Sequence, residues 1–113
     1  MSIVNTGNSE HYIWGENSNG WHLLKSDHLS VIEESVPPNE KEERHYHNLS
    51  DQFFYILSGV AHIEIAGSVF ELKPGDGIHV PAKKPHQLMN QGHADLRFLL
   101  VSQPKSHGDR INV

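Results

Sequence analysis

His45 and His47 are the first residues in the sequence whose type and spacing suggest chemistry. On a β-strand, residues i and i+2 project from the same face, so both imidazoles can meet one ion without backbone strain. Gln52 follows five residues after His47, far enough for a turn and the start of the next strand. His86 comes much later, directly after Pro85, on another expected strand. These four side chains are therefore candidate metal ligands.

Their ligand atoms restrict the kind of metal that the site would accept. The chain has no cysteine, so any metal site must use nitrogen and oxygen ligands. Three imidazoles accept a divalent transition metal ion, such as Zn, Ni, Mn, Fe or Co, and leave coordination positions open for water or substrate. Two interpretations without metal chemistry remain open. His45 and His47 could be a pair of histidines on an edge strand with no function, and Gln52 could form hydrogen bonds beside the site without binding the ion.

The elements that must position these residues are predicted to be strands. Glycine and proline turn signals recur at short intervals, and between them lie short runs of Val, Ile, Phe, Tyr and Leu. This rhythm predicts an all-β fold of about nine strands with almost no helix. Residues 61–65 show the alternation of a strand with one buried face. The same alternation places Phe54 and Ile56 on the side of Gln52, where we expect them to line a substrate pocket.

Two segments resemble the sequence motifs of the cupin family. Residues 45–59 read HYHNLSDQFFYILSG, and residues 75–90 read GDGIHVPAKKPHQLMN, in the family's order and with its spacing. The resemblance implies a double-stranded β-helix, a jelly-roll-like barrel of two antiparallel sheets. It also implies a single cupin domain over residues 1–113, with a core at about 20–102, and metal ligands at His45, His47, His86 and the Gln52 position.

The chain departs from the family pattern at two positions. Lys83 stands where the family usually has glycine, which affects a turn, and Gln52 stands where it usually has glutamate. A neutral amide in place of a carboxylate leaves the metal site more positive by one charge. The ion should then be a stronger Lewis acid, and its oxidised state should be harder to reach. We therefore expect polarisation of an oxygen-bearing substrate in preference to oxygen activation.

The expected function is that of a metal-binding cupin acting on a small oxygen-bearing metabolite, in the manner of an isomerase, cyclase or lyase. Two alternatives stay open: a non-catalytic cupin that binds a sugar-like small molecule, and a metal-dependent dioxygenase. A general base in the pocket would favour an enzyme, and the sequence offers His79 and Glu71 as candidates. The fold itself does not decide, because cupins host many activities.

Composition and charge limit the kinds of molecule that the protein is expected to bind. The net charge of −5 and the absence of a basic stripe argue against nucleic acid. No apolar run approaches the roughly 20 residues needed to span a bilayer, and the start resembles no signal peptide, so we expect a cytoplasmic protein. Cupin-like barrels pair through exposed edge strands, which predicts a homodimer with Met1 to Trp14 at the interface. We expect the charged run Glu40 to Arg44 to be solvated and the tail Ser106 to Arg110 merely to end the chain.

Overall fold

A computed structural model describes residues 2–113 and contains eleven strands and no helix in that range. The expected all-β class is confirmed. Because successive side chains on a strand point to opposite faces, β5 alternates between buried and exposed positions over residues 51–57, and β10 alternates along its whole length. The strands are β1 (Glu10–Trp14), β2 (Ser18–Lys25), β3 (Ser30–Val36), β4 (His45–His47), β5 (Asp51–Ser58), β6 (Ala61–Ile65), β7 (Ser68–Leu72), β8 (Gly77–Val80), β9 (His86–Met89), β10 (Leu96–Gln103) and β11 (Arg110–Asn112).

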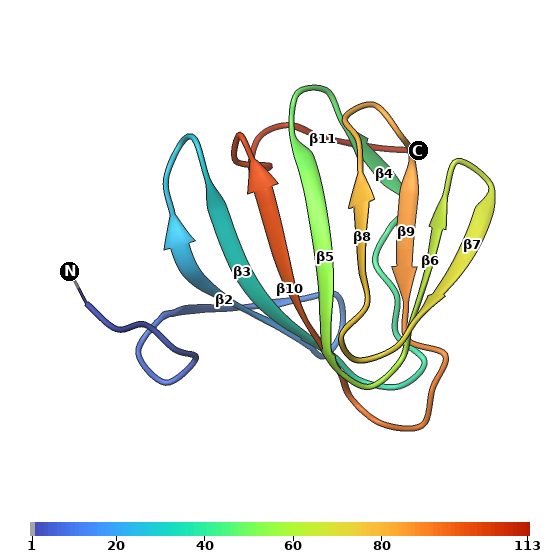
Figure 1. The fold of residues 1–113 in the computed structure, drawn as a ribbon, viewed down its shortest axis with the longest axis horizontal. Coiled ribbons are helices and arrows are strands. Elements are labelled where there is room, and N and C mark those ends of the chain that lie inside the picture. Colours follow the sequence, from blue (N-terminus) through green and yellow to red (C-terminus); the bar gives the residue numbers. More distant parts are fainter. Residues whose placement is uncertain (1) are drawn as a thin grey trace.

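The strands form two antiparallel sheets. A six-stranded sheet has the order β1-β2-β3-β10-β5-β8, and a five-stranded sheet has the order β11-β4-β9-β6-β7. In Figure 1 the first sheet runs from β2 on the left to β8, and β9, β6 and β7 lie on the right. Consecutive strands pair in β1-β2-β3 and in β6-β7, whereas β10 lies between β3 and β5 and β9 lies between β4 and β6. This strand order places strands from the first and second halves of the chain side by side around the interior of the barrel.

The inner faces of both sheets supply one hydrophobic core. Phe54 and Ile56 enter it from β5, as the alternation predicted, and Phe98 enters from β10. The rings of Phe54 and Phe98 lie 5.7 Å apart between centroids, within the range of favourable aromatic contacts. The other buried apolar residues are Ile32, Val36, Ala61, Ile63, Leu72, Val80, Leu88, Leu96 and Leu100.

Both ends of the chain form strands, of which the sequence indicated the N-terminal one and not β11. β1 pairs with β2 and is an edge of the six-stranded sheet, so the expected interface segment is an edge strand, although Met1 lies outside the described residues. β11 pairs with β4, where Arg110 is opposite His47 and Asn112 is opposite His45. The tail therefore does more than end the chain, and that expectation was wrong. β11 pairs along one edge of β4, the strand that carries the candidate ligands His45 and His47.

Within residues 2–113 the structure shows no helix with the length and apolar character to cross a membrane.

Candidate metal centre

The three histidines that the sequence singled out converge in the barrel. His45 and His47 project inward from β4, and His86 does so from β9, directly opposite His45 in the strand register. One ring nitrogen of each lies within 4.8 Å of those of the other two. The three side chains are buried, with relative exposures of only 1 to 4%. This spacing is close enough for all three imidazoles to bind one ion.

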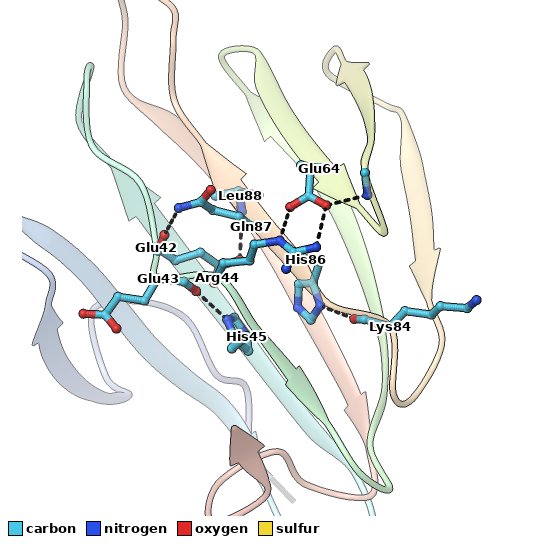
Figure 2. Close-up of polar contacts among 10 residues, drawn as sticks. Glu42, Glu43, Arg44, His45, Glu64, Lys84, His86, Gln87 and Leu88 are labelled. Carbon is cyan, nitrogen blue, oxygen red and sulfur yellow. Dashed lines mark hydrogen bonds and ion pairs between the residues drawn. The ribbon is translucent and has the colours of Figure 1, made fainter. Parts of the chain in front are cut away.

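Each imidazole is held in place by its second ring nitrogen. Nδ1 of His45 donates to the backbone carbonyl of Glu43 at 2.7 Å, and Nδ1 of His86 donates to that of Lys84 at 3.0 Å. Figure 2 shows both bonds, with the two rings on neighbouring strands. Nδ1 of His47 donates to the carbonyl of Asp109 at 3.0 Å. With its proton on Nδ1, each ring presents the lone pair of Nε2 to the site, the arrangement that orients metal-bound histidines.

The atoms that remain without a partner lie where a metal ion would use them. Nε2 of His47 and Nε2 of His86 are buried and make no hydrogen bond with any described residue. The amide oxygen Oε1 of Gln52 is also buried and unbonded, while its Nε2 donates to Oγ of Ser102 at 3.1 Å. An unpaired buried polar atom is costly, so three together require an explanation. A transition metal ion would satisfy all three, and the residues present therefore fit one.

Burial keeps the histidines in the form that binds metal. It lowers the pKa of His45 from its ordinary value to about 3, and the neighbouring His86 contributes to this shift. Burial also lowers the pKa of His47 and of His86. Because a charged imidazole loses its hydration inside the barrel, the neutral form is favoured. The rings are therefore unprotonated at neutral pH.

A charge pair on the outer face ties the strands of the centre together. Arg44, just before β4, donates from Nε and Nη2 to the two carboxylate oxygens of Glu64 on β6, at 2.7 and 3.2 Å. In Figure 2 its side chain extends across β9 toward Glu64. The Arg44 guanidinium holds the pKa of the Glu64 carboxyl below its usual range. This bidentate pair spans three strands of the sheet that carries the histidines.

A cavity of about 240 Å³ opens beside the histidines. Phe54 lines it, whereas Ile56, which the sequence placed on the same wall, belongs to the core. The volume lies below the roughly 300–1,000 Å³ of pockets for drug-sized ligands, which indicates a small occupant. The full lining consists of Tyr12, Trp14, Ile32, Glu34, Glu42, His45, His47, Gln52, Phe54, Leu100, Ser106, His107, Gly108 and Arg110.

The C-terminal segment Ser106–Arg110 forms one side of this cavity. It is fixed by Asp109, whose carboxylate accepts hydrogen bonds from the backbone N–H groups of Asn48, Leu49 and Ser50 at 2.9 to 3.0 Å. Those three bonds lower the pKa of the Asp109 carboxyl. The sequence showed only a polar turn here, and the three bonds could not be foreseen from it.

Sequence reasoning missed two carboxyl groups in the cavity and favoured two groups outside it. His79 and Glu71 are exposed side chains, near Asp51 at 3.6 Å and near His62 at 3.7 Å, and neither lines the cavity. The acidic residues that do line it are Glu34 and Glu42. A signal existed for Glu34, because it lies in phase with Ile32 and Val36 on β3. None existed for Glu42, which belongs to the run expected to be solvated.

Three histidines and one amide meet inside an antiparallel β-barrel, an arrangement that could hold a metal ion. The chain belongs to the cupin family, since the family's sequence model, described as a cupin domain, matches residues 32–102. An uncharacterised protein of Methanocaldococcus jannaschii is 36% identical over 88 residues, which is 77% of this chain and 70% of that protein. The expected fold, a cupin jelly roll, is thereby confirmed.

Two further similarities carry different activities. The quercetin 2,3-dioxygenase of Bacillus subtilis is 32% identical over 63 residues, 56% of this chain but only 19% of that enzyme. The polyketide cyclase RemF of Streptomyces resistomycificus superposes with a TM-score of 0.86 at 23% identity, covering 100% of this chain and 85% of that one. Because the similar proteins include both a dioxygenase and a cyclase, the reaction must be inferred from the side chains of the site.

Proposed function

We propose that this cupin is an enzyme that binds one divalent transition metal ion through His45, His47, His86 and Gln52. The ion would polarise an oxygen atom of a small carbonyl or hydroxyl compound bound in the cavity, as a Lewis acid. Isomerisation, ring closure and elimination all begin with such polarisation. The observation that carries the proposal is the meeting of unpartnered His47 Nε2, His86 Nε2 and Gln52 Oε1 in a buried interior.

The neutral fourth ligand separates this proposal from oxygen activation. Gln52 contributes an amide oxygen, which leaves the full charge of a divalent ion uncompensated by the protein's ligands. Ser102 holds the amide nitrogen at 3.1 Å, which fixes the oxygen toward the histidines. Higher net charge strengthens Lewis acidity and disfavours the oxidised ion that a dioxygenase would need. The dioxygenase similarity therefore supports the fold and the metal and does not supply the reaction.

The cavity supports a small metabolite as the substrate. Phe54 and Leu100 give it apolar surface, and the histidines and Glu34 give it polar groups. A few fixed polar groups in an otherwise apolar pocket orient a ligand by its oxygen atoms. A non-catalytic binder would use the same contacts, but it would not need Glu34 and Glu42, the two half-buried carboxyl groups of the cavity wall.

Substitution of one histidine tests the proposal. Metal-free protein is reconstituted with Zn, Ni, Mn, Fe or Co and assayed against small hydroxy-carbonyl compounds. His86→Ala should bind no stoichiometric metal and should lose turnover by at least about 100-fold. His79→Ala, which changes an exposed histidine on β8, is the matched control and should keep both metal binding and turnover. Equal turnover in the His86→Ala protein would end the proposal.

A further inference from the structure

Glu34 and Glu42 place two carboxyl groups in the wall of the cavity that the candidate ligands His45, His47 and Gln52 also line. Glu34 points inward from β3, between the buried residues Ile32 and Val36. Neither carboxyl group forms an ion pair with another residue of the described chain. Burying a carboxylate without a cationic partner is expensive, so a fold that keeps two such groups calls for a reason beyond stability.

A row of residues across three strands fixes Glu34. Tyr12 on β1 lies opposite Gly20 on β2, and Gly20 lies opposite Glu34 on β3. The ring of Tyr12 occupies the space over Gly20, where any Cβ would collide with it. This places the Tyr12 hydroxyl so that it donates to Oε2 of Glu34 at 2.9 Å. No hydrogen bond from the described chain reaches the other oxygen, Oε1, which leaves it available in the cavity.

Glu42 is fixed from a different direction. Its Oε1 accepts a hydrogen bond from the backbone N–H of Leu88 at 2.9 Å, and its backbone N–H donates to the Leu88 carbonyl at 3.1 Å. Oε2 of Glu42 makes no hydrogen bond within residues 2–113. Each carboxyl group therefore has one anchored oxygen and one oxygen without a protein partner. A proton-transfer group needs this combination of a fixed position and an oxygen that is free to contact the substrate.

Burial also brings both groups into the range useful for proton transfer. It raises the pKa of Glu34 from 4.5 to about 7, against the opposing hydrogen bond from Tyr12. It raises the pKa of Glu42 to about 8, to which the nearby Glu34 contributes. A group that titrates near the working pH can both accept and return a proton. Glu42 is the more strongly protonated of the two at neutral pH.

We propose that Glu34, positioned by Tyr12, is the proton-transfer group of the reaction, and that the substrate is a small carbonyl compound with a hydrogen on the carbon next to the carbonyl. This inference rests on the proposed function, because the polarised oxygen is what makes that hydrogen acidic. It extends the proposed function by naming both the residue that moves the proton and the substrate class.

The step conserves atoms and electrons. The carboxylate of Glu34 accepts the proton from the carbon beside the carbonyl, the C–H bond breaks, and its electron pair becomes the C=C bond of an enolate. The electron pair of the C=O bond moves onto the carbonyl oxygen at the same time. Glu34 is then a carboxylic acid whose proton can exchange with solvent, and it returns a proton either to the same carbon or to the former carbonyl carbon. In the second case the proton of the substrate hydroxyl moves to the former carbonyl oxygen, and the hydroxyl carbon becomes the new carbonyl. Return to the same carbon exchanges the hydrogen with solvent, and return to the former carbonyl carbon isomerises an α-hydroxy carbonyl compound. No oxidant or reductant is needed.

The surroundings of Glu34 determine how this step depends on pH. The groups around it are Tyr12 on β1, Glu42 before β4 and Arg110 on β11. The ring of His22 packs against Tyr12, and His107, which also lines the cavity, packs against His22. Tyr12 and Arg110 favour the carboxylate, whereas burial favours the acid. Since the base must be unprotonated, the rate should rise with pH through the titration of Glu34. Tyr12→Phe removes a donor to the carboxylate and should move that rise to higher pH.

Hydrogen exchange tests the proposal without knowledge of the natural substrate. The zinc-loaded protein is incubated in D₂O with dihydroxyacetone, and loss of the carbon-bound hydrogen is followed by proton NMR. Wild type should catalyse exchange, and Glu34→Gln should lose at least about 100-fold of that rate, the lower range for a general base. Two measurements are made on the variant in parallel. Its zinc content should equal that of wild type, and its thermal unfolding should show that it is folded.

Glu33→Gln is the matched control, because Glu33 is the adjacent residue on β3 and pairs with Arg97 away from the cavity. It should exchange hydrogen as fast as wild type. A Glu34→Gln protein that exchanges hydrogen at the wild-type rate would overturn the proposal. A Tyr12→Phe protein whose exchange rate depends on pH in the same way as that of wild type would also overturn it. Wild-type protein that binds zinc but exchanges nothing would overturn the acid–base role and leave the metal site standing. Failure of wild type to bind zinc would refute the proposed function instead.

Discussion

The backbone carbonyl of Asp109 accepts the hydrogen bond from Nδ1 of His47 at 3.0 Å, although 62 residues separate the two in the chain. The Asp109 carboxylate at the same time accepts the backbone N–H groups of residues 48–50, which directly follow β4. One residue of the C-terminal segment therefore fixes both a candidate metal ligand and the loop beside it. The tail belongs to the site.

Asp109→Ala should weaken metal binding. The substitution removes the three hydrogen bonds that hold the carbonyl against His47, so the imidazole loses its orientation. Loss of such a supporting contact typically costs about 10- to 100-fold in metal affinity. Competition with a chelator measures the zinc affinity. Asp27→Ala, which breaks the exposed pair with Lys105 just before the C-terminal segment, is the control and should leave the affinity unchanged.

Gln52→Glu should tighten metal binding and slow the reaction. A carboxylate compensates one charge of the ion, which favours binding and weakens the ion as a Lewis acid. We expect zinc affinity to rise by about 10-fold or more and turnover to fall. Gln52→Leu, which removes the oxygen at similar volume, should lower the affinity. If neither variant changes zinc affinity, Gln52 is a neighbour of the ion and does not coordinate it.

Glu34→Gln should stabilise the metal-free protein increasingly as the pH rises from 4.5 to 7. Well below pH 4.5 the carboxyl is protonated in both states, so it has no effect. As the pH rises, the unfolded chain ionises while the folded state, whose pKa is raised to about 7, holds its proton, and the wild type loses stability. The difference should reach at most about 3 kcal/mol near pH 7. Urea unfolding at several pH values measures it, with Glu33→Gln as the control. A difference independent of pH would show that the pKa of Glu34 is not raised.

We propose that two copies of the chain pair through β1. β1 is an edge of the six-stranded sheet, its outer edge has no strand partner among the described residues, and the side chain of Ile13 is 68% exposed. Unprotected edges invite strand addition, and charged residues oppose it. Wild type should therefore be a dimer by light scattering at micromolar concentration, and Ile13→Lys should be a monomer. A monomeric wild type would contradict the pairing.

Much of the site could be predicted because its residues follow strand rules. The alternation of side chains placed Gln52 and Phe54 on one inner face, and the His45-x-His47 spacing placed two rings together. Glu42 could not be predicted, because its burial depends on hydrogen bonds with Leu88, 46 residues away. The strand at Arg110–Asn112 was equally hidden, since a three-residue strand has too few side chains to show a pattern and forms only against β4.

Position 83 shows how a departure from the family pattern is accommodated. Lys83 lies in the turn between β8 and β9 with φ of 69°, the left-handed region in which glycine is favoured. Its backbone N–H donates to the carbonyl of His47 at 2.6 Å. The turn keeps the conformation that glycine would adopt, so the effect of Lys83 is local to the backbone.

Metal stoichiometry at the three-histidine site is the most direct test of the account. Protein stripped of metal with a chelator is titrated with zinc by calorimetry and then analysed for bound metal after gel filtration. We expect about one zinc ion per chain for wild type and for His79→Ala, and none for His45→Ala or His86→Ala. A wild-type chain that retains no divalent ion, or an His86→Ala chain that binds zinc as tightly as wild type, would contradict it.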